Sequence, residues 1–301
     1  NFNVVVGDEA GTAITTGDTN VAVGYAALST EDTASRSTAV GYRALLTQNA
    51  GDVSTFNVAI GYEAGFGMTT GVENTLIGGA AGDALTDADY NVAIGRGALS
   101  DDTLGSQSVA IGYLALNVQN FTTATNSLNT AVGTKAGLNV TTGVQNTLIG
   151  AESGDALTTG NHNTAVGHNA LAVDTLGSKS VAVGNGTLGT QNFTTATNVY
   201  NVAIGYDAGL SVTTGTSNVL IGGLAGDALT DADFNIAIGK NSLGADTLGS
   251  ASVAIGHGAL LTQNFTTATT VYNVAVGHNA GKLITTGTGQ TLIGGLAGDA
   301  I

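Results

Sequence analysis

The pentapeptide Asn-Val-Ala-Ile-Gly at 57–61 recurs, with small changes, along the whole of this 301-residue chain. Val or Ile precedes the closing glycine in every copy, and the position four before that glycine is Asn in twelve copies and Ser in four. Most copies lie 17 residues apart and every fourth gap is longer, so four types of copy alternate in a 72-residue super-repeat. The closing glycines stand at 7, 24, 41, 61, 78, 95, 112, 133, 150, 167, 184, 205, 222, 239, 256, 277 and 294.

This repeat predicts an all-β protein, a parallel β-roll or β-solenoid of about 17-residue coils. Gly, Asn, Thr and Val are weak helix formers, and the pentapeptide has the length and composition of a short strand that ends in a glycine turn. One strand per coil gives 17 coils. We expect a single continuous repeat region over 1–301, partial at both ends, with super-repeats at roughly 57–128, 129–200 and 201–272.

The longer coils carry four extra residues, which should form a loop on one side of every fourth coil. These insertions lie around 120–123, 192–193 and 264–265. Both ends of the sequence fall inside a repeat, and an uncapped solenoid sticks end to end. We therefore expect the chain to be a segment of a longer fibre or filament.

The two faces of the strand differ in composition. Alternation puts Val58 and Ile60 on one face and Asn57 and Ala59 on the other. The larger apolar pair predicts that the first face lies inside the coil. The second face carries no charge in any copy, which favours burial against another chain. We therefore expect a homotrimer, intertwined or side by side, with inter-chain packing by Asn57, Ala59, Asn91, Ala93, Asn129, Ala131, Asn201, Ala203, Asn273 and Ala275.

The recurring asparagine permits two interpretations. Identical amides stacked coil on coil can bond to one another along the stack, as they do in cross-β assemblies. Alternatively, Asn begins each strand at a turn, where its side chain bonds to nearby backbone. The sequence does not separate these alternatives, and neither of them makes a ligand site.

Composition excludes several classes of function. Seven Lys and Arg stand against 22 Asp and Glu, a formal charge of −15, so the chain lacks the basic footprint that nucleic acids and anionic membranes require. The absence of cysteine excludes disulfides, thiolate metal sites and a thiol nucleophile. No apolar run approaches the roughly 20 residues of a membrane helix. We expect no nucleic-acid partner and no membrane insertion.

Acidic residues gather in the copies that carry Leu in the strand. Carboxylates beside glycine turns suit Ca²⁺, which makes a weak calcium site a hypothesis. Against it, the copy at 151–167 keeps only Asp155, and the spacing does not match an EF-hand loop. The sequence favours a solvated acidic turn, and we expect no cofactor. The calcium candidates are Asp83, Asp87, Asp89, Asp227, Asp231 and Asp233.

Other chemistry finds less support. A glycosidase needs two carboxylates in a groove. The candidates Asp101, Asp102, Glu63 and Asp207 recur at equivalent coil positions, whereas a catalytic site usually breaks a repeat. Three histidines follow a closing glycine, where other copies have Tyr, which indicates a partly exposed packing position. Of the three, only His257 and His278 are close enough to be neighbours, too few for a metal site. Thr-Thr-Gly occurs mainly once per super-repeat, too rarely for a flat ice-binding array.

The repeat resembles two families of surface fibres. The runs Asn-Val-Ala-Ile-Gly-Tyr-Glu-Ala-Gly (57–65), Ser-Val-Ala-Ile-Gly-Tyr-Leu-Ala-Leu (108–116) and Ser-Val-Ala-Ile-Gly-His-Gly-Ala-Leu (252–260) look like the head repeats of YadA-like trimeric autotransporter adhesins. With Thr-Thr-Gly at 69–71 and five other places, they are also similar to the "NTAVGYxAL…TTG" repeats of phage tail fibres. The adhesin repeat is shorter, so the coil here should be wider.

The resemblance implies a trimer of parallel β-rolls that presents or makes an attachment to a surface. We therefore expect a non-catalytic shaft or head of an extracellular, cell-surface or virion attachment fibre, of adhesin or tail-fibre type. Its partners would be copies of itself, and a host or cell-surface receptor or glycan bound by domains outside this chain. The alternative is a secreted solenoid that binds or hydrolyses polysaccharide.

Overall fold

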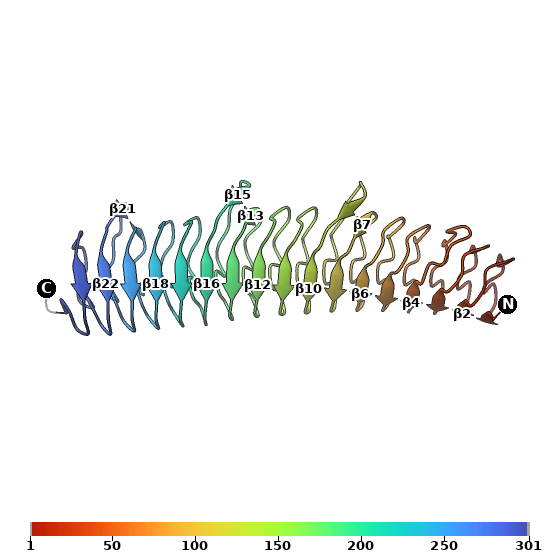
Figure 1. Ribbon diagram of the computed structural model, residues 1–301, viewed down its shortest axis with the longest axis horizontal. Helices are drawn as coiled ribbons and strands as arrows, with labels where there is room; N and C mark the ends of the chain where they lie inside the picture. The colour runs from red at the N-terminus through yellow and green to blue at the C-terminus, as the bar shows by residue number, and fades with distance from the viewer. Residues whose placement is uncertain (1, 300–301) are drawn as a thin grey trace. The chain divides into compact units, whose positions relative to one another are not determined.

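The structure is a computed structural model that describes residues 2–299. Every regular element in that range is a β-strand. The chain divides into two compact units, Asn1–Asn146 and Thr147–Ile301, which are called here the N-terminal and C-terminal units. In each unit one three-residue strand per coil pairs in parallel with the strand of the next coil (Figure 1). The predicted all-β solenoid is therefore confirmed.

The N-terminal unit holds eight of the 17 stacked strands. The register is regular: Val58 of one strand pairs with Thr75 of the next, and Thr75 with Val92. In chain order the strands are β1 (Val4–Val6), β2 (Val21–Val23), β3 (Thr38–Val40), β4 (Val58–Ile60), β5 (Thr75–Ile77), β6 (Val92–Ile94), β8 (Val109–Ile111) and β10 (Thr130–Val132).

The C-terminal unit holds the other nine strands, in the same register. They are β11 (Thr147–Ile149), β12 (Thr164–Val166), β14 (Val181–Val183), β16 (Val202–Ile204), β17 (Val219–Ile221), β18 (Ile236–Ile238), β20 (Val253–Ile255), β22 (Val274–Val276) and β23 (Thr291–Ile293). The number of coils predicted from the glycine spacing is confirmed.

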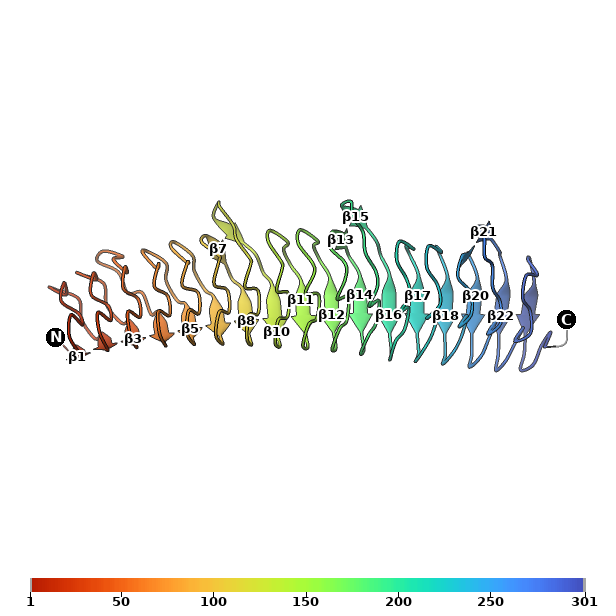
Figure 2. The same cartoon turned by 180° about the vertical axis from the view of Figure 1, so that it is seen from behind.

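The inserted residues form loops at the predicted places. Each longer coil adds a two-residue strand that pairs with the coil before it, and these coils project beyond their neighbours in both views (Figure 1 and Figure 2). The insertion folds its phenylalanine inward, so Phe121 is 5% exposed. The short pairs are β7 (Gly105–Ser106) with β9 (Thr125–Asn126), β13 (Gly177–Ser178) with β15 (Thr197–Asn198), and β19 (Gly249–Ser250) with β21 (Thr269–Thr270).

The closing glycine is required by backbone geometry. At Gly78 the φ angle is +137°, and a Cβ there would lie 2.6 Å from the carbonyl carbon and oxygen of Gly95 in the next coil. Gly61 meets Gly78 in the same way, with a Cβ-to-oxygen distance of 2.4 Å. Only glycine adopts this conformation without strain and lets two backbones approach so closely. The strand therefore ends at the same residue in every coil.

The predicted orientation of the strand was wrong. Val58 is half-buried and Ile60 is 39% exposed, whereas Asn57 and Ala59 are fully buried inside their own chain. The Asn and Ala side chains line the core of the coil, and the Val and Ile side chains face outward. The residues assigned above to inter-chain packing are therefore core residues: Asn57, Ala59, Asn91, Ala93, Asn129, Ala131, Asn201, Ala203, Asn273 and Ala275 are each at most 1% exposed.

The reason is the width of the coil. The interior is filled from the opposite wall, where a buried leucine such as Leu45 follows the closing glycine by four residues. Alanine in the strand leaves room for that side chain. Where glycine replaces the wall leucine, as at Gly82, the space is filled by the strand residue Leu76 and by Leu85, whose methyl groups lie 2.8 Å from an ideal Cβ on Gly82. At Gly65, whose coil has alanine in the strand, the space is filled by Leu45 and Leu76 of the neighbouring coils, so large and small side chains complement one another along the stack and keep the core close-packed.

The asparagine ladder combines both interpretations of the sequence. Asn57 Nδ2 donates to Gly71 O at 2.7 Å, and Asn57 Oδ1 accepts from the Asn74 backbone N at 2.9 Å. The side-chain amides also meet, because Asn74 Nδ2 donates to Asn57 Oδ1 at 3.3 Å. Each asparagine therefore closes its own coil and joins it to the next. These bonds offset the cost of burying the amide.

A buried carboxyl recurs in every fourth coil and was missed in the sequence. Asp102 is fully buried, and its Oδ1 accepts from the backbone N of Gly105 and of Phe121, each at 3.0 Å. Its Oδ2 accepts from Gln119 Nε2 at 2.6 Å, and Gln119 Oε1 accepts from Asn129 Nδ2 at 2.9 Å. Asp174 and Asp246 have the same network, and Glu31 accepts from Gln48 Nε2 and from the backbone N of Ala34. The carboxyl thus ties the longer coil to the coil before it.

Candidate interaction surfaces

The outer strand face is an uncharged surface that runs along each unit. It consists of the first and third residues of each three-residue strand, which are Val, Ile or Thr in all 17 strands. These side chains are half-buried or exposed in the isolated chain, and Ile204 is 40% exposed. Exposed apolar side chains that form a contiguous patch mark interaction sites. This face, rather than the Asn and Ala face, is the surface available to another chain.

A row of rings borders the outer strand face, at the position after the closing glycine. Tyr25, Tyr42 and Tyr62 stack with centroid separations of 5.3 and 5.2 Å. His257 and His278 stack in the same way at 5.2 Å, so the predicted neighbour relation of these two histidines is confirmed. All five rings are exposed. They pack coil on coil at the surface, as the exchange of Tyr and His in the sequence indicated.

The calcium candidates bond to neighbouring coils instead of converging. Asp87 Oδ1 accepts from Thr70 Oγ1 at 2.6 Å, and Asp89 Oδ1 accepts from the Val72 backbone N at 2.8 Å. Asp83 bonds with Ser100 in the following coil at 2.7 Å. Within residues 2–299, no group of three or more His, Asp and Glu side chains could hold a metal ion. The calcium hypothesis, which included Asp227, Asp231 and Asp233, therefore has no geometric basis.

The carboxylates considered for hydrolysis have separate surroundings. Asp101 is exposed, but Asp102 is enclosed in the network described above and is not accessible to a substrate. Glu63 pairs with Arg43 at 3.5 Å on the surface. Adjacent positions in the sequence thus point to opposite sides of the coil wall, and the sequence pair 101–102 does not form a pair in space.

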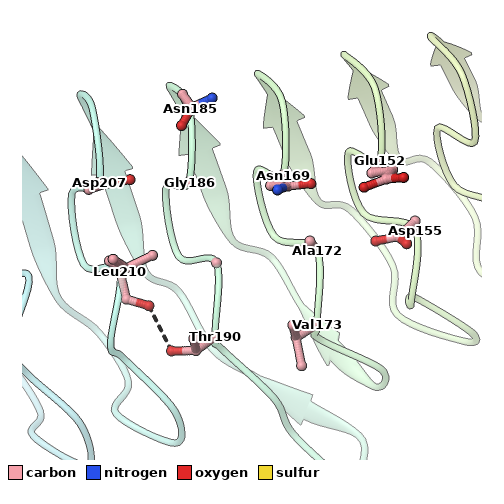
Figure 3. A pocket seen from close by; sticks show the side chains of 11 residues that line it. Glu152, Asp155, Asn169, Ala172, Val173, Asn185, Gly186, Thr190, Asp207 and Leu210 are labelled. Atoms are coloured by element: carbon pink, nitrogen blue, oxygen red, sulfur yellow. Dashed lines mark hydrogen bonds between the residues drawn. The ribbon is translucent and has the colours of Figure 1, made fainter.

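A shallow depression lies on the C-terminal unit, with a volume of about 420 Å³ (Figure 3). It arises at Gly186 and Gly189, where the coil lacks the side chains that its neighbours carry. Glu152 and Asp155 stand at one end and Asp207 at the other (Figure 3). Glu152 and Asp207 hold equivalent positions three coils apart, or about 14 Å, which exceeds the separation used by a glycosidase pair. We assign no chemistry to this depression.

A second exposed row went unnoticed in the sequence. It is formed by the residue directly before the Asn, Ser or Gln that precedes each strand, and this residue has a left-handed backbone in all 16 coils from Thr19 to Gly289. Tyr200, Phe234 and Tyr272 belong to it and are 52%, 64% and 68% exposed. The signal was present, because Phe or Tyr stands at this position in five of the 16 copies, at 56, 90, 200, 234 and 272, but it becomes meaningful only when the coils are stacked.

No family model, curated protein or solved structure matches this chain. The described part of the chain also contains no helix with the length and apolar character of a membrane span.

Proposed function

We propose that this chain is a non-catalytic shaft or head segment of an extracellular or virion attachment fibre, assembled as a homotrimer through the outer strand face. The observation that carries the proposal is the uninterrupted ladder of Val, Ile and Thr on that face in both units. Seventeen coils without one charged residue at these positions are unexpected for a surface that meets only water. The repeat's resemblance to adhesin heads and tail-fibre repeats supports the same function.

The geometry explains why such a segment would be stiff. Within each unit, successive coils are hydrogen-bonded through their strands, through their turns and, in most coils, through the buried asparagine. Among the described residues, no buried side-chain nitrogen or oxygen lacks a hydrogen-bond partner. A stack of this kind resists bending because any bend breaks bonds on one side. Rigid presentation at a distance is the mechanical task of a fibre.

The test is the molar mass in solution by light scattering, for the wild type and two matched variants. Ile204→Glu places a charge on the outer strand face, and Val173→Glu places one on a loop of similar exposure, 40% against 44%. We expect a mass of three chains for the wild type and for Val173→Glu, and of one chain for Ile204→Glu, with unchanged circular dichroism. A monomeric wild type, or a trimeric Ile204→Glu variant, would refute the interface.

A polysaccharide-binding solenoid is the second candidate function. The observation that favours it is the exposed row of aromatic residues before the strands, which does not belong to the outer strand face.

A further inference from the structure

We propose that Tyr200, Phe234 and Tyr272 form a platform that binds an extended, neutral, β-linked polysaccharide along the C-terminal unit. These three rings are called here the aromatic platform. The platform lies on this chain itself and does not depend on the trimer. It therefore goes beyond a shaft that leaves recognition to other domains.

The register of the strands sets the spacing of the platform. Strand residues Val202, Val219, Ile236, Val253 and Val274 pair in register from one coil to the next. The three rings lie two residues before the first, the third and the fifth of these residues. Tyr200, Phe234 and Tyr272 thus stand on alternate coils. Two strand spacings separate successive rings by about 9.6 Å. This matches the length of a disaccharide unit in an extended β-1,4-linked chain, so every second sugar would meet a ring.

The residues between the rings leave them accessible. Ser217 and Ala251 occupy the same position in the two intervening coils, and both are small. Large and small side chains therefore alternate along this row from Tyr200 to Tyr272. A pyranose ring presents an apolar face of C–H groups, which packs on an aromatic face, and its hydroxyl groups remain in water or bond to polar neighbours. Lys179 holds the same position in the coil before Tyr200. Its Nζ donates to the Tyr200 hydroxyl at 3.1 Å and lies 5.1 Å from the ring centroid, so it covers part of that ring.

The rings stand at a position with a left-handed backbone in all 16 coils from Thr19 to Gly289, and they do not fill the core. Phe234 has φ +60° and Tyr272 has φ +57°, a conformation that favours Gly and Asn. Across the 16 coils, however, this position never holds Asn and holds Gly only once. The rings are exposed, so they do not fill the core. The left-handed backbone belongs to the coil, and the rings are placed on it without serving the core.

Charge selects the class of polysaccharide. The chain carries a net charge of −15, which repels sulfated and uronic-acid polymers. Ser217 and Ala251 add no positive charge between the rings, and Lys179 at the end of the platform is bonded to the Tyr200 hydroxyl. The platform therefore suits a neutral glycan such as a β-1,4-glucan.

The test is isothermal titration with cellohexaose, a hexamer long enough to reach all three rings, and with maltohexaose, whose α-linkages curl the chain. Phe234→Asn removes the central ring and suits the left-handed backbone, so the variant should fold at least as well as the wild type. Tyr206→Ala removes a ring of similar exposure, 62%, from the other row. We expect binding of cellohexaose but not of maltohexaose, a two- to tenfold loss, in order of magnitude, for Phe234→Asn, and no change for Tyr206→Ala.

Two results would overturn the platform. One is equal affinity of wild type and Phe234→Asn for cellohexaose, including no binding by either. The other is a change of molar mass in Phe234→Asn, which would assign the rings to a contact between chains. The second measurement separates this proposal from the trimer, because the outer strand face is tested by Ile204→Glu and the platform by Phe234→Asn.

Discussion

Removing the buried carboxyl of Asp102 should destabilise the N-terminal unit far more than removing the exposed carboxyl beside it. In Asp102→Ala, the backbone N–H groups of Gly105 and Phe121 both lose their acceptor. Gln119 Nε2 also loses Asp102 but keeps Ser108 Oγ at 2.9 Å. Two buried donors are therefore left without a partner.

The magnitude follows from the cost of an unsatisfied buried donor, about 1–3 kcal/mol each, which gives about 2–6 kcal/mol for Asp102→Ala. Asp102→Asn keeps Oδ1 for the two backbone groups and places a donor against Gln119 Nε2. Asp102→Asn should lower the free energy of unfolding by about 1–3 kcal/mol. This loss is smaller than that of Asp102→Ala, partly because the amide needs no desolvation of a carboxylate. Asp101→Ala removes an exposed carboxyl and should change stability by no more than about 0.5 kcal/mol.

Chemical denaturation measures this order, and hydrogen exchange locates its cause. We expect the amides of Gly105 and Phe121 to lose protection in Asp102→Ala and to retain it in Asp102→Asn. Equal stability of Asp102→Ala and Asp101→Ala, or unchanged protection of both amides in Asp102→Ala, would refute the reasoning. It would show that the network adjusts without loss.

Three further results are expected. Gly78→Ala should lower the free energy of unfolding by at least about 1–3 kcal/mol because of its backbone conformation alone. Gly79→Ala should leave it nearly unchanged, because a Cβ there would meet nothing closer than 4.0 Å. Urea denaturation measures both values, and similar values for the two variants would contradict the close-approach argument. Burial raises the pKa of Asp83, Asp174 and Asp227 above the ordinary value of 3.8. These carboxyl groups therefore bind a proton at a higher pH in the folded chain than in the unfolded chain. Stability from these groups is greatest at low pH and is lost as pH rises through their folded-state pKa, and the Tm should rise on acidification from about pH 7 to about pH 4; a falling Tm would count against it. Addition of a chelator should leave the Tm unchanged, and a decrease would revive the calcium hypothesis.

The repeat pattern in the sequence was sufficient to predict the fold class. The closing glycine and the Val or Ile before it repeat with the coil, because each coil must meet its neighbour in the same way. The spacing therefore predicted the number of coils, the parallel pairing of their strands and the places of the inserted loops. It also predicted that His257 and His278 are neighbours, since stacking in register brings equivalent positions together.

Which side of the strand faces inward was decided by the tertiary structure alone. Alternation separates Val58 and Ile60 from Asn57 and Ala59, but it does not say which pair is buried. That depends on the width of the coil and on the leucines that fill it from the opposite wall. The burial of Asp102 beside the exposed Asp101, and the alignment of Phe234 with rings two coils away, have the same origin. They result from contacts between residues that lie 17 or more positions apart in the chain, which become neighbours only when the coils are stacked.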